Sequence, residues 1–86
     1  MNMVIVTLNC GREGRRKHYD MEIPCGVPVQ ILIQHICETL YAYSGGRLDL
    51  ASGKLSLYCP RLDRTLQANE TFESAGIWNG DYMDLK

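Results

Sequence analysis

Apolar residues recur along this chain with two different periods, which predict strands at both ends and a helix between them. Residues 3–8 (Met-Val-Ile-Val-Thr-Leu) are rich in β-branched side chains, and residues 18–23 alternate polar and apolar. Both patterns are typical of strands. The intervening residues 10–17 hold two glycines and four cations, a composition that indicates a hairpin tip. The chain is therefore predicted to begin with a β-hairpin.

A helical period follows the hairpin. Pro28 suits the first position of a helix, where a missing N–H costs little. Gly45 and Gly46 follow the last periodic residues and can adopt the left-handed conformation that ends a helix. The apolar positions have the spacing of a helix packed on a core: Val29, Leu32, Ile33, Ile36, Cys37 and Leu40. This is the only segment that we predict to be a helix.

Shorter strands are predicted in the second half of the chain. Residues 54–59 alternate as a third strand, and residues 64–67 are predicted to be a short fourth strand. Residues 71–77 are interpreted as a turn-rich segment. Asn-Gly within residues 79–81 is a strong turn signal, because both residues tolerate a positive φ. The alternating residues 82–85 are then predicted to form the last strand.

This order of elements implies an α+β domain. One helix would pack across a mixed sheet of four to five strands, with the first and last strands parallel and adjacent at its centre. A chain of 86 residues is the length of one domain, so residues 1–86 are predicted to fold as a single unit.

Composition excludes several classes of protein. The net charge is −1, so no overall field draws the chain to nucleic acid or to an acidic membrane. No stretch approaches the ~18–20 apolar residues that would span a bilayer, and no signal segment is recognised. We therefore expect a cytoplasmic protein with reduced thiols.

The four cysteines carry no recognisable metal motif. Their positions, 10, 25, 37 and 59, provide neither the close pairs of zinc sites nor the close triplet of a β-grasp iron–sulfur protein. We therefore predict no metal and no cofactor. Cys37 and Cys59 are predicted to be small core residues. Cys10 and Cys25 lie near turns and are candidates for exposed thiols, with a redox role left open.

No catalytic constellation is apparent either. His35 and Cys37 are two positions apart on the predicted helix, so their side chains point in different directions. Gly11 and Gly14 are not followed by the Lys-Ser/Thr pair of a phosphate-binding loop. The sequence does not predict an enzyme.

Three segments, together with the order of elements, are similar to those of a known family. They are the proline-led helix start at residues 27–29, a short return segment from residue 63 through residue 72, and a closing Gly-Ile-Trp-Asn-Gly-Asp at residues 76–81. With these segments the chain resembles, over nearly its whole length, the ubiquitin-like β-grasp fold and the YukD/EsaB-like family of bacterial type VII (WXG100) secretion systems.

The resemblance implies a function. It implies an accessory or regulatory protein of the secretion apparatus without catalytic activity, which binds a membrane-embedded or ATPase component. Such a protein would be cytoplasmic, or held at the inner face of the membrane through its partners. A related β-grasp domain forms the cytosolic N-terminus of multi-span membrane components in actinobacterial systems. A general β-grasp adaptor unrelated to secretion is the alternative within the same fold.

Ubiquitin-like modifiers and sulfur carriers react through an exposed C-terminal Gly-Gly. The sequence ends in Asp84-Leu85-Lys86, and its only Gly-Gly pair is internal, at Gly45 and Gly46. We therefore disfavour a modifier or sulfur carrier, which would need cleavage of a longer precursor.

A protein-binding surface is predicted on the sheet face away from the helix. If Val6 faces the helix, then Ile5, Tyr58 and Tyr82 face outward and form a candidate patch of apolar and aromatic side chains. A register shift of one residue would reverse this assignment. For Trp78, in the closing turn, we favour packing on the core over a contact with a partner.

The hairpin tip is a second candidate site. Arg12, Arg15, Arg16 and Lys17 could dock on phosphates or on an anionic membrane surface, but we favour a solvated hairpin tip as the simpler explanation. Nucleic-acid binding is not predicted, because that function needs a basic face with interleaved aromatics. Self-association is left open.

Overall fold

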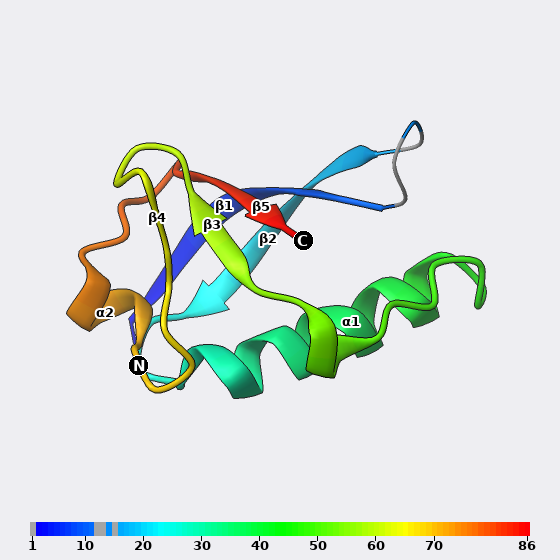
Figure 1. Cartoon of the computed structure of the whole chain (residues 1–86), viewed down its shortest axis with the longest axis horizontal. Helices are drawn as coiled ribbons and strands as arrows, with labels where there is room; N and C mark the ends of the chain where they lie inside the picture. Colours follow the sequence, from blue (N-terminus) through cyan, green and yellow to red (C-terminus); the bar gives the residue numbers. More distant parts are fainter. Residues whose placement is uncertain (1, 12–13, 15) are drawn as a thin grey trace.

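The structure is a computed structural model that describes residues 2–11, 14 and 16–86, and it consists of a five-stranded sheet with one long helix across one face (Figure 1). The strand order is β2-β1-β5-β3-β4. The elements are β1 (Met3–Cys10), β2 (Lys17–Pro24), α1 (Val29–Tyr43), a 3₁₀ turn (Ser52–Lys54), β3 (Leu57–Cys59), β4 (Arg64–Thr65), α2 (Phe72–Ala75) and β5 (Tyr82–Leu85).

The first and last strands lie side by side at the centre of the sheet (Figure 1). β1 pairs with β5 in parallel, with Thr7 opposite Tyr82, and pairs with β2 antiparallel on its other side. β5 pairs antiparallel with β3, where Tyr58 lies opposite Asp84. The predicted β-grasp topology is thereby confirmed.

The core lies between the sheet and α1. Val6, Leu8 and Met83 are fully buried, whereas Ile5 is 48% exposed. This alternation confirms the predicted strand faces and excludes the one-residue register shift. Tyr19 and Met21 are partly buried against the same core.

The helix α1 begins one residue later than predicted. Pro28 is the N-cap, and Val29 is the first helical residue. The first free N–H groups of the helix donate to a distant loop: Val29 to the Glu70 carbonyl at 2.8 Å and Gln30 to the Ala68 carbonyl at 3.0 Å. At the other end Gly46 has φ 86°, a conformation that favours glycine as predicted.

Two predicted strands are shorter in the structure. The third strand begins at Leu57 rather than at residue 54. Ser56 still exchanges backbone hydrogen bonds with Lys86, but the N–H groups of Lys54 and Leu55 donate to the carbonyls of Ala51 and Ser52 instead of to a strand. Residues 52–54 form the 3₁₀ turn instead. The fourth strand is only Arg64–Thr65.

A second, short helix lies in the segment that the sequence indicated as turn-rich. The hydroxyl of Thr71 accepts from the Ser74 N–H, and the Ser74 hydroxyl accepts from the Thr71 N–H, both at 3.0 Å. This reciprocal capping box starts α2, and Gly76 ends it in the left-handed conformation. α2 places Phe72 in the core with no exposed surface.

All four cysteines are free and buried. The prediction for Cys37 and Cys59 is confirmed, but the expectation of exposed thiols at Cys10 and Cys25 is wrong. Cys10 is 1% exposed because β1 continues for two residues past Leu8 and keeps its alternation. Cys25 is 8% exposed, and its backbone bonds to Asn2 and Glu73 on either side.

Candidate protein-binding face

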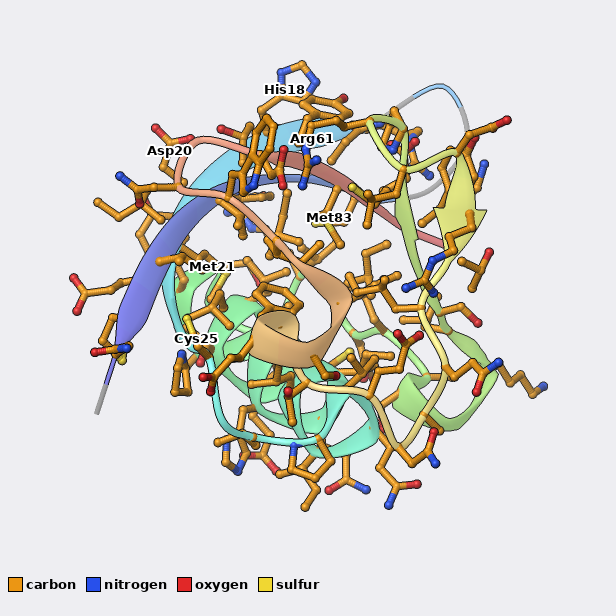
Figure 2. All side chains as sticks on the ribbon, turned by 90° about the vertical axis from the view of Figure 1, so that its left-hand side faces the viewer. His18, Asp20, Met21, Cys25, Arg61 and Met83 are labelled. Carbon is orange, nitrogen blue, oxygen red and sulfur yellow. The ribbon has the colours of Figure 1, made fainter. Side chains whose placement is uncertain are left out.

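The sheet face opposite α1 carries the side chains predicted to bind partners, and we call it the open face. Figure 2 shows His18, Asp20 and Arg61 on this side of the molecule, whereas Met21 and Met83 point toward the interior. The outward side chains that the strand register places on the open face include Ile5, Thr7, Asn9, His18, Asp20, Glu22, Tyr58, Tyr82 and Asp84.

The three predicted patch residues share this face and stand diagonally to one another across the strands. Tyr82 lies opposite Thr7 and is therefore diagonal to Ile5. Tyr58 lies opposite Asp84 and is diagonal to Tyr82. Ile5 and Tyr82 are 48% and 36% exposed. Thr7 and Asp84 lie beside these three side chains, so the open face mixes apolar, aromatic and polar groups.

Tyr82 is held in place by His18. The Tyr82 hydroxyl lies 3.0 Å from His18 Nε2, and the two rings meet edge to face with centroids 5.5 Å apart. His18 stands opposite Asn9 of β1, so this contact reaches across β1 from β2 to β5. The ring of Tyr82 is thereby fixed before any partner arrives.

Tyr58 is positioned by charged neighbours. Its hydroxyl donates to Asp63 Oδ1, and this bond raises the pKa of the Tyr58 phenol. The Lys86 ammonium lies 4.9 Å from the centre of the same ring. Tyr58 therefore presents an ordered, uncharged ring at neutral pH.

Polar side chains between the aromatics are paired with each other. Thr7 Oγ1 donates to Asp20 Oδ1 at 2.6 Å, and Asn9 Nδ2 donates to Asp84 Oδ1 at 2.8 Å. Arg16 Nη2 donates to the Asn9 carbonyl at 2.9 Å and lies 3.6 Å from Asp84 Oδ1. These pairings give the face a fixed arrangement of hydrogen-bonding groups.

The basic tip is only partly within the described residues. Arg16 and Lys17 are exposed, and Arg16 leans toward the open face through Asp84. Arg12 and Arg15 lie outside the described residues. The structure therefore connects one of the four predicted cations with the open face.

Trp78 does not pack on the core, so the prediction for this residue is wrong. Its side chain is 63% exposed, and the Arg61 guanidinium stacks on its ring with Cζ 3.8 Å from the centroid. Arg61 is held in turn by Asp81, through Nε to Oδ1 at 2.7 Å and Nη2 to Oδ2 at 2.9 Å. The Trp78 ring is therefore largely exposed to solvent, and one of its faces is covered by the Arg61 guanidinium.

The closing turn is built around two side-chain acceptors. Asn79 Oδ1 accepts from the Ile5 N–H at 2.7 Å and ties the turn to β1. Asp81 is 7% exposed and accepts from the Trp78 N–H and from Arg61. The hydrogen bonds from Arg61 lower the pKa of Asp81 against the opposing effect of burial. Asp81 therefore stays ionised at neutral pH.

Sequence reasoning missed Arg61, Asp63 and His18 as parts of this face. The sequence did point to Asn79 and Asp81, because both belong to the closing motif at residues 76–81. No sequence pattern points to Arg61, because its contacts lie 15 to 20 residues away in the chain and depend on the fold.

The described residues hold no group of three or more His, Cys, Asp or Glu that could bind a metal ion. In the same residues no helix is both long and apolar enough to cross a membrane.

Structural comparison places the chain in the ubiquitin-like class. The ubiquitin of Caldiarchaeum subterraneum is similar with a TM-score of 0.71 and 19% identity, covering 98% of this chain and 91% of that one. The ubiquitin-like domain of the Mycobacterium tuberculosis type VII secretion protein EccD1 gives 0.73 at 22% identity, covering 99% and 98%. That of EccD5 from Mycobacterium xenopi gives 0.78 at 13%, covering 100% and 94%.

Residues 3–85 match the family described as WXG100 protein secretion system (Wss), protein YukD. The chain belongs to this family, so it is a ubiquitin-like domain associated with type VII secretion. A comparison with curated proteins gives no match. The resemblance read from the sequence is thereby confirmed for the fold and the family.

Proposed function

We propose that this chain is a non-enzymatic accessory or regulatory protein of a WXG100 secretion system, and that it acts by binding protein components through its open face. Residues 1–86 would act as one domain, in the cytoplasm or at the inner face of the membrane through its partners. The proposal rests on family membership together with one structural observation. That observation is the pair of exposed, immobilised aromatics Trp78 and Tyr82.

The physical argument is preorganisation. The few residues that carry most of the binding energy at protein interfaces are enriched in tryptophan, tyrosine and arginine, and rings fixed in advance lose less conformational freedom on binding. Trp78 is stacked on Arg61, and Tyr82 is bonded to His18. The polar groups between them already have intramolecular partners, so a docking protein would leave few of them unpaired.

A membrane-embedded or ATPase component of the apparatus is the partner that fits best. A chain of the solved MycP5-free ESX-5 inner membrane complex is similar with a TM-score of 0.75 and 15% identity, covering 98% of this chain and 20% of that one. In that chain a ubiquitin-like domain is part of a larger polypeptide. This chain would reach the components of such a machine by non-covalent docking.

A modifier or sulfur carrier remains the competing class. It predicts a C-terminal adduct on target lysines, which mass spectrometry of the native cell would detect. A general adaptor outside secretion predicts partners that do not belong to the apparatus.

Affinity purification from the native cell tests the proposal. We expect the wild-type chain to retain an identified secretion component, and the Tyr58→Ala/Tyr82→Ala double variant to lose it. Trp78→Ala tests the closing turn separately. Tyr41→Ala is the matched control, because Tyr41 is 49% exposed on α1 and lies off the open face. Retention of every partner by the double variant and by Trp78→Ala would contradict docking through this face.

A further inference from the structure

β2 is a long edge strand with one free side. It pairs with β1 along all eight residues, and no other strand pairs with it in the described part of the chain. The opposite edge of the sheet, β4, has two residues. An unpaired edge of this length is a template for another strand, and proteins usually shield it with prolines, bulges or a covering loop.

The free backbone groups of β2 follow from the hydrogen bonds of β1. Gly80 donates to the Ile5 carbonyl at 2.7 Å, and the Thr7 N–H donates to the Asp81 carbonyl at 2.9 Å. Odd-numbered residues of β1 therefore bond toward β5, and even-numbered residues bond toward β2.

The register then assigns the groups on β2 itself. The even residues of β1 face the odd residues of β2, for example Leu8 and Tyr19. The N–H and C=O groups of His18, Asp20 and Glu22 therefore point away from the sheet. No backbone bond beyond the β1–β2 ladder uses them among the described residues.

Over its first seven residues this edge carries neither a proline nor a bulge, and only polar and charged side chains such as Lys17, Asp20 and Glu22 shield it. The β1–β2 register runs without a bulge from Met3 opposite Pro24 to Cys10 opposite Lys17. Proline occurs only at the last position, Pro24, where it ends the run of donors. The strand is thus ready to pair over residues 18–22.

The charges along the edge select an antiparallel copy of the same strand. Arg16 and His18 lie at one end, and Asp20 and Glu22 lie at the other. In one antiparallel register His18 faces Asp20 of the second copy and Arg16 faces its Glu22, each pair occurring twice. Registers shifted toward Pro24 place acidic residues opposite each other, which is destabilising.

The free atoms of these side chains suit that register. Asp20 uses Oδ1 for Thr7, and its Oδ2 has no hydrogen bond within the described residues. His18 meets Tyr82 through Nε2, so Nδ1 is the nitrogen left to face a second carboxylate. Arg16 uses Nη2 alone and keeps further donors.

The helix-side face of the same register brings aromatics together. Tyr19 would face Tyr19 of the second copy, next to Tyr43 of each α1. Tyr43 is 79% exposed, and its ring meets that of Tyr19 edge to face at 6.1 Å. A second copy would therefore cover the most exposed aromatic of this chain.

We propose that two copies of this chain associate through antiparallel β2–β2 pairing in this register. The twofold axis stands perpendicular to the sheet, so the two sheets join into one and both open faces point the same way. The dimer offers a partner two identical docking faces at once, which raises avidity without new contacts. This association is independent of the function proposed above.

Sedimentation equilibrium over a range of concentrations tests the pairing. We expect the wild-type mass to approach twice the 9.8 kDa of one chain. Arg16→Glu places a carboxylate opposite Glu22 of the second copy, and Glu22→Lys places a cation opposite Arg16 of the second copy. Like charges then face each other, so each variant alone should remain at the mass of one chain. An equimolar mixture of the two variants should form a heterodimer, because each new charge then meets its opposite.

The controls separate pairing from folding. Glu38→Lys makes the same charge reversal on the exposed surface of α1 and should dimerise like the wild type. Far-ultraviolet circular dichroism should show that each variant is folded. If Arg16→Glu is not folded, because it loses the ion pair with Asp84, then Glu22→Lys alone decides the matter. If Arg16→Glu is folded, the Arg16→Glu/Glu22→Lys double variant adds a test, because it restores both charge pairs. The double variant should dimerise. A wild-type chain that stays monomeric, or a Glu22→Lys variant that still dimerises, would overturn the proposal.

Discussion

The Arg61 guanidinium donates hydrogen bonds to both carboxylate oxygens of Asp81, at 2.7 and 2.9 Å, although the two residues lie in different turns. Arg61 comes from the turn between β3 and β4, and Asp81 immediately precedes β5. The same guanidinium donates to the Gly76 carbonyl at 2.7 Å and stacks on Trp78. One side chain thus fastens the closing turn and presents its exposed ring.

Replacing Asp81 with Asn should destabilise the fold. Asp81→Asn keeps the shape but removes the charge that holds Arg61, in a side chain that is 7% exposed. Losing a charged hydrogen-bond partner at such a site costs about 2 kcal/mol in free energy of unfolding. Urea denaturation measures the loss. Asp63→Asn is the control, since Asp63 is exposed and bonds only one side chain, Tyr58. Equal losses in both variants would contradict a special role for Asp81.

The closing turn also shows how far the sequence alone leads. Asn-Gly-Asp at residues 79–81 predicts the turn and the last strand, because those signals are local. The acceptor roles of Asn79 and Asp81 depend on Ile5 and Arg61, which the fold brings from elsewhere. Periodicity predicts which face a strand residue occupies, but it does not predict which distant side chain will lie beside it.

The wrong burial predictions for Cys10 and Trp78 have the same origin. The glycine after Cys10 indicates a turn there, yet the ladder with β2 extends as far as Cys10 opposite Lys17. The large apolar ring of Trp78 favours a place in the core, yet Arg61 provides a partner for it at the surface. In both cases a contact with another part of the chain decides the outcome.

Stability should depend on pH through Glu70. Two hydrogen bonds from Arg64 lower the pKa of Glu70 from 4.5 to about 2 in the folded state. A lowered folded-state pKa contributes stability that is present above pH 4.5 and is lost as pH falls toward 2. The difference in free energy of unfolding between wild type and Glu70→Gln should therefore be constant above pH 4.5 and should shrink as the pH falls from 4.5 toward 2. Thermal unfolding across the pH range measures it.

Glu73→Gln provides the matched control for that series. It removes an acidic side chain of the same type three residues away, and Glu73 is exposed. A difference curve for Glu73→Gln with the same shape as that for Glu70→Gln would show that the Arg64 pair is not its cause.

The four thiols should react slowly in the native protein. All are buried, and burial raises the pKa of Cys10 and Cys37, so little thiolate is present at neutral pH. We expect a thiol reagent such as Ellman's to label native protein at a rate that follows unfolding, and to count four thiols in denaturant. A thiol in the native state that reacts as fast as free cysteine would contradict the burial of these residues.

Phe72 should be among the most costly residues to truncate. It is fully buried at the start of α2, and replacing such a ring with alanine costs about 3–5 kcal/mol. Ile31→Ala, at a position 37% exposed on α1, should cost far less in the same denaturation assay. If Phe72→Ala does not fold, Phe72→Leu should fold with a smaller loss. A small effect of Phe72→Ala would show that α2 is not anchored in the core.

Trp78 is the only tryptophan, so its fluorescence reports directly on the closing turn. With 63% of the side chain exposed, native emission should resemble that of indole in water, and acrylamide should quench it nearly as well as in unfolded protein. Arg61→Ala should increase quenching further, because the guanidinium covers one face of the ring at 3.8 Å. Blue-shifted emission with weak quenching would instead place the ring in the core. The same signal should shift to the blue when a partner docks on the open face, whereas a partner that binds only to α1 should leave it unchanged.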